Sequence, residues 1–176
     1  MSRAIRLVSG SMDATLKRTR DLLSDEFGMD VMRVVRTSKH VDLLVLRDVT
    51  AIVGVGGAIN LLMAFSFEYS MLDELTRRMV PDEARARLKW DTYRREAALE
   101  IVNIVAGHCT EDWQSDADII PLSPPVVIEQ ARSIHRPHAA RFACIALETA
   151  HGHFDINFIG PADLFDDDLN YIEQTD

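Results

Sequence analysis

The chain has 176 residues, of which 47% are hydrophobic and 27% are charged. This length and composition suit one globular domain with a continuous core and exclude an intrinsically disordered chain. The formal net charge of −9 argues against nucleic acid or an anionic membrane as a partner. We therefore expect a single domain over residues 1–176.

Nothing in the sequence predicts secretion or insertion into a membrane. The first ten residues lack the features of a signal peptide. The longest apolar stretch, residues 51–65, contains three glycines and is shorter than the ~20 residues that a membrane helix needs. Cys109 and Cys144 are too few for a disulfide scaffold and have no cysteine near them at metal-ligand spacing. We expect a soluble, cytoplasmic protein with both cysteines reduced in the core.

The first half of the chain predicts one helix followed by a run of strands. A helix is expected over residues 13–27, with Gly28 ending it. Segments rich in β-branched and other apolar residues predict strands over 31–36, 41–47, 50–55 and 58–67. Gly56 and Gly57 suit a hairpin turn between the last two strands.

Helical spacing returns after residue 67 and gives way to strands again near the end. Helices are expected over 68–79 and, with a break allowed, over 82–109; strands are expected over 126–128, 142–148 and 153–159. In the last strand apolar side chains alternate with His153, Asp155 and Asn157, which is typical of an antiparallel sheet with one polar face. An acidic, solvated tail is expected from about residue 163. The fold class is α+β: two layers, with a mainly antiparallel sheet of about six strands packed against long helices.

The second long helix carries an unusual polar stripe. At about 100° per residue, Glu96, Glu100, Asn103 and Gly107 fall on one narrow strip, and nearly all the remaining positions from 97 to 106 are apolar. Solvated strips usually mix in lysine and arginine, whereas asparagine and glycine are poor helix formers. The stripe is either a plain solvated face or a working surface, and these residues alone do not favour one over the other.

The stripe resembles the signature of the CheC, CheX and FliY chemotaxis phosphatases. The resemblance rests on Glu100-x-x-Asn103, an acidic residue four positions earlier at Glu96, and the downstream prolines Pro124 and Pro125. The segments 103–107 and 122–126 look most like the CheX branch, and the resemblance covers residues 14–159. It implies a CheC/CheX-like fold and a homodimer.

The resemblance also implies an activity: removal of the phosphoryl group from the aspartate of a CheY-like response regulator. Asn103 would orient the attacking water, since an amide both donates and accepts hydrogen bonds. Glu100 would pair with the active-site lysine of the regulator, while Glu96 and Gly107 would lie at the partner-binding surface. The chain would bind no cofactor itself, because Mg²⁺ is expected on the partner regulator.

Two other functions stay open. One is a catalytically silent, CheX-like homodimeric module that binds a receiver domain or another signalling protein. The other is a small-ligand sensor that uses the polar face of the last hairpin. A metal site at the histidines is disfavoured, because Pro137 separates His135 from His138 and because His151 and His153 flank a turn.

Overall fold

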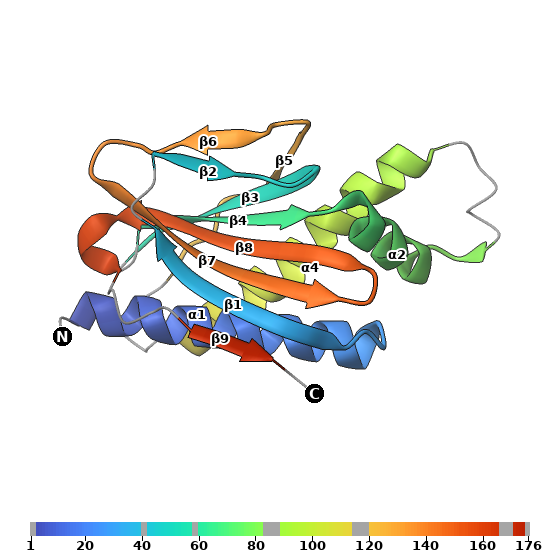
Figure 1. The fold of residues 1–176 in the computed structure, drawn as a ribbon, viewed down its shortest axis with the longest axis horizontal. Coiled ribbons are helices and arrows are strands. Elements are labelled where there is room, and N and C mark those ends of the chain that lie inside the picture. Colours follow the sequence, from blue (N-terminus) through green and yellow to red (C-terminus); the bar gives the residue numbers. More distant parts are fainter. Residues whose placement is uncertain are drawn as a thin grey trace.

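The structure, a computed structural model, describes residues 3–39, 42–57, 60–82, 89–113, 120–165 and 171–174. Its elements, shown in Figure 1, are α1 (Arg3–Asp21), the short π-turn η1 (Leu22–Glu26), β1 (Val31–Lys39), β2 (Leu43–Val45), β3 (Val49–Val55), β4 (Leu61–Phe67), α2 (Tyr69–Met79), α4 (Trp90–Trp113), β5 (Val126–Glu129), β6 (Ser133–His135), β7 (Ala140–Thr149), β8 (Gly152–Pro161), the 3₁₀ turn η2 (Ala162–Leu164) and β9 (Tyr171–Gln174).

The main sheet has seven strands in the order β5-β3-β4-β8-β7-β1-β9, and every neighbouring pair is antiparallel. A second, two-stranded sheet consists of β2 and β6. The predicted α+β class and the mainly antiparallel sheet are confirmed. The β3–β4 hairpin turns at the predicted Gly56-Gly57 pair, and the β7–β8 hairpin turns between the strands predicted over 142–148 and 153–159.

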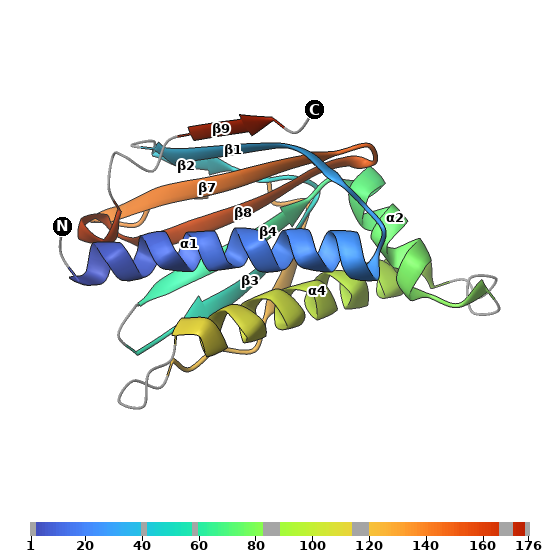
Figure 2. The same cartoon turned by 90° about the horizontal axis from the view of Figure 1, so that it is seen from below.

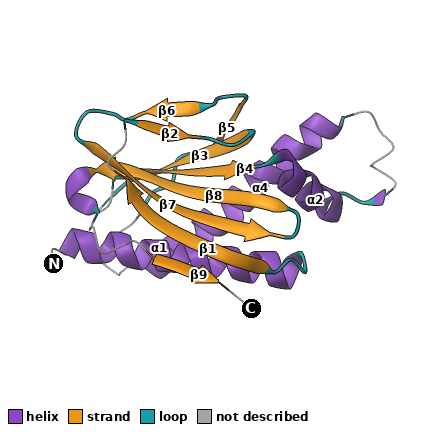
Figure 3. Cartoon of the chain, viewed as in Figure 1, coloured by secondary structure: helices purple, strands orange, loops and turns teal. Residues whose placement is uncertain are grey.

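The layers lie on opposite faces of the main sheet. Figure 2 shows α1 and α4 side by side across one face, and Figure 3 shows the short strands β2 and β6 over the other. Along β8, Phe154, Ile156 and Phe158 belong to the large core under the helices. Asp155 and Asn157 alternate with them and therefore point to the face that carries β2 and β6. A smaller core lies there, formed by Leu44, Leu46, Ala64, Phe142 and Ile159.

The first helix begins ten residues earlier than the sequence predicted. α1 starts at Arg3 instead of residue 13. Val8, Met12 and Leu16 recur every four residues and are all buried, so the apolar stripe already runs through the segment before residue 13. Gly10 in this segment is exposed and has open space around it.

Three differences concern the strands and the C-terminus. The segment 41–47 forms only the three-residue β2, which lies outside the main sheet, and β6 was not predicted. The expectation of a solvated tail is wrong where the structure describes it: Leu164 and Phe165 are buried, and β9 pairs with β1 as the seventh strand. Residues 166–170 of the acidic run lie outside the described residues. Leu164 and Phe165 lie within the acidic run, and their burial shows that net charge alone did not predict the position of this segment.

Both cysteines are buried and unoxidised, as predicted. Cys109 lies in the core beneath α4, and Cys144 lies on the opposite face of the sheet. Among the helices that the structure describes, none is long and apolar enough to span a bilayer.

Two glycines provide a matched test of this fold. Gly152 has φ +127°, and a Cβ there would lie 2.5 Å from Ser70 Oγ. We expect Gly152→Ala to lower the free energy of unfolding by about 1–3 kcal/mol, because strain and steric overlap act together. Gly10→Ala, in an exposed helix position, should raise it by about 0.5–1 kcal/mol. Urea unfolding measures both, and equal stability of Gly152→Ala and wild type would contradict the turn geometry.

Candidate functional site

α4 is packed on most of its circumference. Its buried residues are Ala97, Ala98, Ile101, Val102, Val105, Ala106, Cys109 and Thr110. These side chains face α1 and the sheet, so the helix has little freedom to rotate or slide. Whatever α4 presents to solvent is therefore held in a fixed place.

The remaining strip of α4 is the stripe that the sequence predicted. Glu96, Glu100 and Asn103 are exposed, and Gly107 is half-buried. Within the part of the chain that the structure describes, none of these three polar side chains forms a hydrogen bond or an ion pair. The stripe therefore presents two carboxylates and one amide to solvent, with their hydrogen-bonding capacity available to a partner.

Gly107 leaves open space next to Asn103. No atom lies within 4 Å of where its Cβ would be, so packing within the described residues does not require glycine here. Its carbonyl accepts a hydrogen bond from Thr110 Oγ1 at 2.9 Å. The missing side chain lowers the surface of the helix one turn after Asn103 and leaves room that no described residue fills.

The N-terminal end of α4 is fixed to α2. Asp73 Oδ1 accepts hydrogen bonds from Trp90 Nε1 and Arg94 Nε, both at 2.8 Å. The Arg94 guanidinium also lies 4.6 Å from the centre of the Tyr69 ring. Burial opposes the charge on Arg94, but the hydrogen bond and charge of Asp73 outweigh it and raise the pKa of Arg94. This clamp sets the position of the helix turn that precedes Glu96.

A second contact ties α4 to the edge of the sheet. Arg95 Nη2 and Nε bind Glu129 Oε2 of β5 at 2.7 and 2.9 Å. The hydrogen bond and charge of Glu129 raise the pKa of Arg95. Pro124, exposed, and Pro125, half-buried, directly precede β5. Arg95 thus connects the stripe-bearing helix to the strand that follows the predicted prolines.

On its other side α4 borders the C-terminal end of α1. A small hollow of about 170 Å³ lies between them, lined on α4 by Ile104, Val105 and His108. The other side of its lining carries Asp21, Asp25 and Glu26 together with Arg18, and Asp21 is paired with Lys17. This flank therefore has mixed charge with an excess of carboxylates.

The histidines that the structure describes can be checked for a metal centre. Over the described ranges, no group of three or more His, Cys, Asp or Glu is placed to hold a metal ion. His135 and His138 are exposed, while His153 Nδ1 lies 3.1 Å from Glu68 Oε2.

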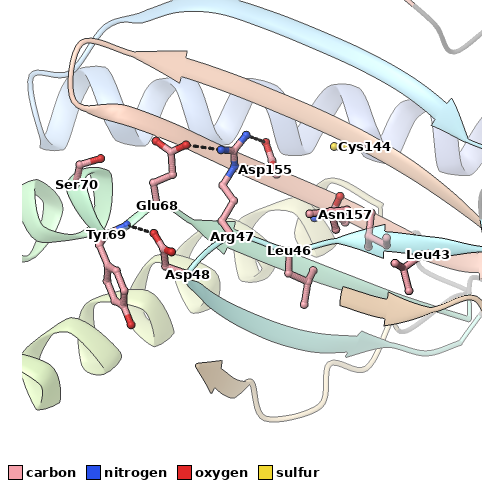
Figure 4. Close-up of a pocket in the computed structure, with 12 residues that line it drawn as sticks. Leu43, Leu46, Arg47, Asp48, Glu68, Tyr69, Ser70, Cys144, Asp155 and Asn157 are labelled. Atoms are coloured by element: carbon pink, nitrogen blue, oxygen red, sulfur yellow. Dashed lines mark hydrogen bonds and ion pairs between the residues drawn. The ribbon is translucent and has the colours of Figure 1, made fainter. Parts of the chain in front are cut away.

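The structure reveals a polar cluster that the sequence did not predict as a unit. Arg47, just after β2, binds Asp155 through Nε and Nη2 at 2.7 and 3.0 Å, and Glu68 through Nη1 at 2.5 Å (Figure 4). Burial opposes ionisation of Glu68, but hydrogen bonds from His153 and the charge of Arg47 outweigh it and lower the pKa of Glu68. The alternation along β8 predicted a polar face. It could not show that Arg47, more than 100 positions away in sequence, would join that face.

Comparison with known proteins identifies the fold. No family model matches the chain, and no curated protein sequence matches it. Among solved structures, the chemotaxis protein CheX from Desulfovibrio desulfuricans is similar with a TM-score of 0.71 and 19% identity, over 84% of this chain and 97% of that one. A putative chemotaxis protein from Desulfovibrio vulgaris Hildenborough has a TM-score of 0.71 and 21% identity, over 84% and 94%.

A third similar structure is the complex of CheX with CheY, BeF₃ and Mg²⁺ from Borrelia burgdorferi. Its TM-score is 0.62 at 13% identity, and the match covers 85% of this chain and 97% of that one. The matches extend over nearly the whole length of the solved chains. The predicted CheX-like fold is therefore confirmed. At identities this low, the similarity shows the fold and nothing further.

The stripe on α4 and the Asp73 clamp that holds α4 to α2 should respond differently to substitution. Asn103→Ala and Glu100→Ala should leave the free energy of unfolding within about 0.7 kcal/mol of wild type, with Asn103→Ala the more stable because alanine is the better helix former. Asp73→Ala should lower it by about 1–3 kcal/mol, because Trp90 and Arg94 lose a shared, partly buried acceptor. Chemical unfolding of the three variants decides this, and a large loss from Asn103→Ala would mean that the stripe is structural.

Proposed function

We propose that this chain hydrolyses the phospho-aspartate of a CheY-like receiver domain. The observation that carries the proposal is the pair Glu100 and Asn103: both exposed, one turn apart, and without partners among the described residues on a helix otherwise packed into the core. The CheX fold supports it, because one protein of this fold has been solved in complex with CheY.

The reaction requires this chain mainly to position the attacking water and the receiver. Water attacks the phosphorus in line with the bond to the aspartate oxygen, that bond breaks, and the aspartate leaves as a carboxylate while phosphate is released. Asn103 would accept a hydrogen bond from the water through Oδ1 and fix its direction. Orienting one reacting group in this way typically contributes on the order of 10² to 10³ in rate. Mg²⁺ would be bound by the receiver.

Glu100 would dock the receiver. A carboxylate one helical turn from Asn103 can pair with a lysine ammonium in the phosphorylation pocket while the amide reaches the phosphoryl group. Glu96, a further turn away, would contact the rim of the interface. The rigid seat of α4 supports this proposal, because a water-orienting group must be held to a fraction of an ångström.

Phosphate release from a phosphorylated CheY-type receiver tests the catalytic role. We expect Asn103→Ala to lower the hydrolysis rate on the order of 10²-fold or more while the affinity for the receiver stays close to that of wild type. Glu100→Lys should weaken docking at least about tenfold, because it places two like charges together. Glu148→Gln, on the opposite face of the sheet, is the control and should change neither.

The outcomes separate the two open functions. If the wild-type protein binds the receiver but dephosphorylation stays at the uncatalysed rate, the chain is a silent binding module and not an enzyme. Hydrolysis that is equal in wild type and Asn103→Ala would remove the water-orienting role.

Gly107 tests where the partner approaches. The open space at its Cβ predicts that Gly107→Leu folds normally, since no described atom obstructs it. A leucine one turn from Asn103 should nevertheless block close docking, so we expect a loss of receiver affinity of roughly tenfold or more, with Gly107→Ala intermediate. Unchanged affinity in Gly107→Leu, measured by titration with the receiver, would place the interface elsewhere.

The homodimer that the resemblance implies stays a prediction. The main sheet ends in β5 and β9, and β2 pairs only with β6 among the described strands, so several strand edges are available for pairing.

A further inference from the structure

Strand β2 has one paired edge and one open edge. Leu44 lies opposite β6 in their ladder, and on the same side Leu46 N–H donates to Arg132 O at 2.9 Å. Because backbone groups alternate in direction along a strand, the N–H and C=O groups of Leu43 and Val45 point away from β6. Among the described residues, no hydrogen bond reaches these four groups. The open edge of β2, defined by Leu43 and Val45, therefore offers two donors and two acceptors.

A hollow of about 780 Å³ follows this open edge. It is lined on one side by the consecutive residues 43–48, and its floor is the main sheet at Cys144 and Asn157 (Figure 4). The edge closes at Arg47, whose N–H donates to Ser66 Oγ of β4 at 2.7 Å. A strand added to β2 would lie about 4.8 Å from it, which places that strand in the hollow above the floor.

The open edge lacks the charged side chains and prolines that usually protect an edge strand. All three residues of β2 are aliphatic, and Leu43 and Val45 are 41% and 71% exposed. By contrast β5, an edge of the main sheet, directly follows two prolines and ends in a glutamate that is paired with α4. Apolar side chains beside unpaired backbone groups are typical of an edge that another strand covers.

The main sheet under the hollow excludes pairing of β2 with the β2 of a second copy. The two-fold axis of such an antiparallel pair is perpendicular to the ribbon, so both strands would turn the same face to the same side. In each copy that face carries Leu44 and Leu46, which pack onto the main sheet through Phe142 and Ile159. The second main sheet would have to occupy the space that the floor of the hollow already fills. The added strand must therefore be an extended segment with no folded layer beneath it.

We propose that the open edge of β2 binds an extended peptide segment of another protein by strand addition. The segment would exchange backbone hydrogen bonds with Leu43 and Val45 and make the β6–β2 ribbon three-stranded. Its outward side chains would lie beside those of Leu43 and Val45, where β-branched and aromatic residues pair best, and the alternate side chains would enter the hollow. The hollow shares no lining residue with the stripe on α4, so this binding does not require that the chain is a phosphatase.

Selection from a displayed library of random linear peptides, with the full chain as bait, tests this. Val45→Pro removes an N–H that no described residue uses, and proline is tolerated on the solvent side of an edge strand. We expect the selected peptides to carry β-branched or aromatic residues at alternate positions and to bind Val45→Pro at least about tenfold more weakly than wild type. Val45→Thr keeps the N–H and the shape of the side chain, so it is the matched control and should bind as wild type. Equal enrichment on wild type and Val45→Pro would overturn the proposal.

Two measurements on the wild-type chain decide the matter even if Val45→Pro does not fold. A selected peptide is synthesised with N-methyl groups at either its odd or its even positions. Only one set of its N–H groups can face β2, so one version should bind at least about tenfold more weakly and the other close to the unmodified peptide. The unmodified peptide should also slow hydrogen exchange at the Leu43 and Val45 amides. Equal binding of the two versions, or unchanged exchange, would overturn the proposal. Slow exchange without peptide that increases with protein concentration would also overturn it, because a second copy would then cover the edge.

Discussion

The packing of α4 into the core is the constraint on which the rest of the structure depends. Its buried face of small and branched side chains lets the helix lie close to α1 and the sheet, and the Asp73 and Glu129 contacts hold it to α2 and β5. A helix fixed on three sides has one orientation only. The direction in which Glu100 and Asn103 project is thus a property of the whole core, including residues that never approach a partner.

This arrangement also explains why poor helix formers are tolerated where they occur. Asparagine at 103 and glycine at 107 cost together about 1–2 kcal/mol of helix propensity relative to alanine. The buried side of the same helix offsets that cost. A position that lowers helix stability without gaining a side-chain contact among the described residues is the pattern expected of a group that serves a partner.

The sequence predicted most of the elements that show a helical or strand period, and few of the features that depend on contacts between distant residues. The hairpins, the α+β class and the exposed stripe follow from local alternation and helical spacing. The start of α1 was misplaced although the sequence has a serine, Ser2, directly before it. β9 was missed because a strand beyond an acidic run gains its stability from pairing with β1, over 130 residues away. For the same reason the sequence predicted Glu100 and Asn103, which share one helix, but not the joining of Arg47, Glu68 and Asp155, which come from three separate segments.

The first turn of α2 lies between the Arg47 cluster and the stripe-bearing helix. On the side of the cluster, Asp48 accepts the Tyr69 N–H and Arg47 binds Glu68, the residue that precedes the helix. On the other side, the Tyr69 ring lies against Arg94 of α4, which Asp73 of α2 also binds. Asp48 and Glu68 are therefore in contact with the element that positions the N-terminal end of α4. Since Glu100 lies less than two turns beyond Arg94, the face of the sheet opposite the helices has a continuous set of contacts to the stripe.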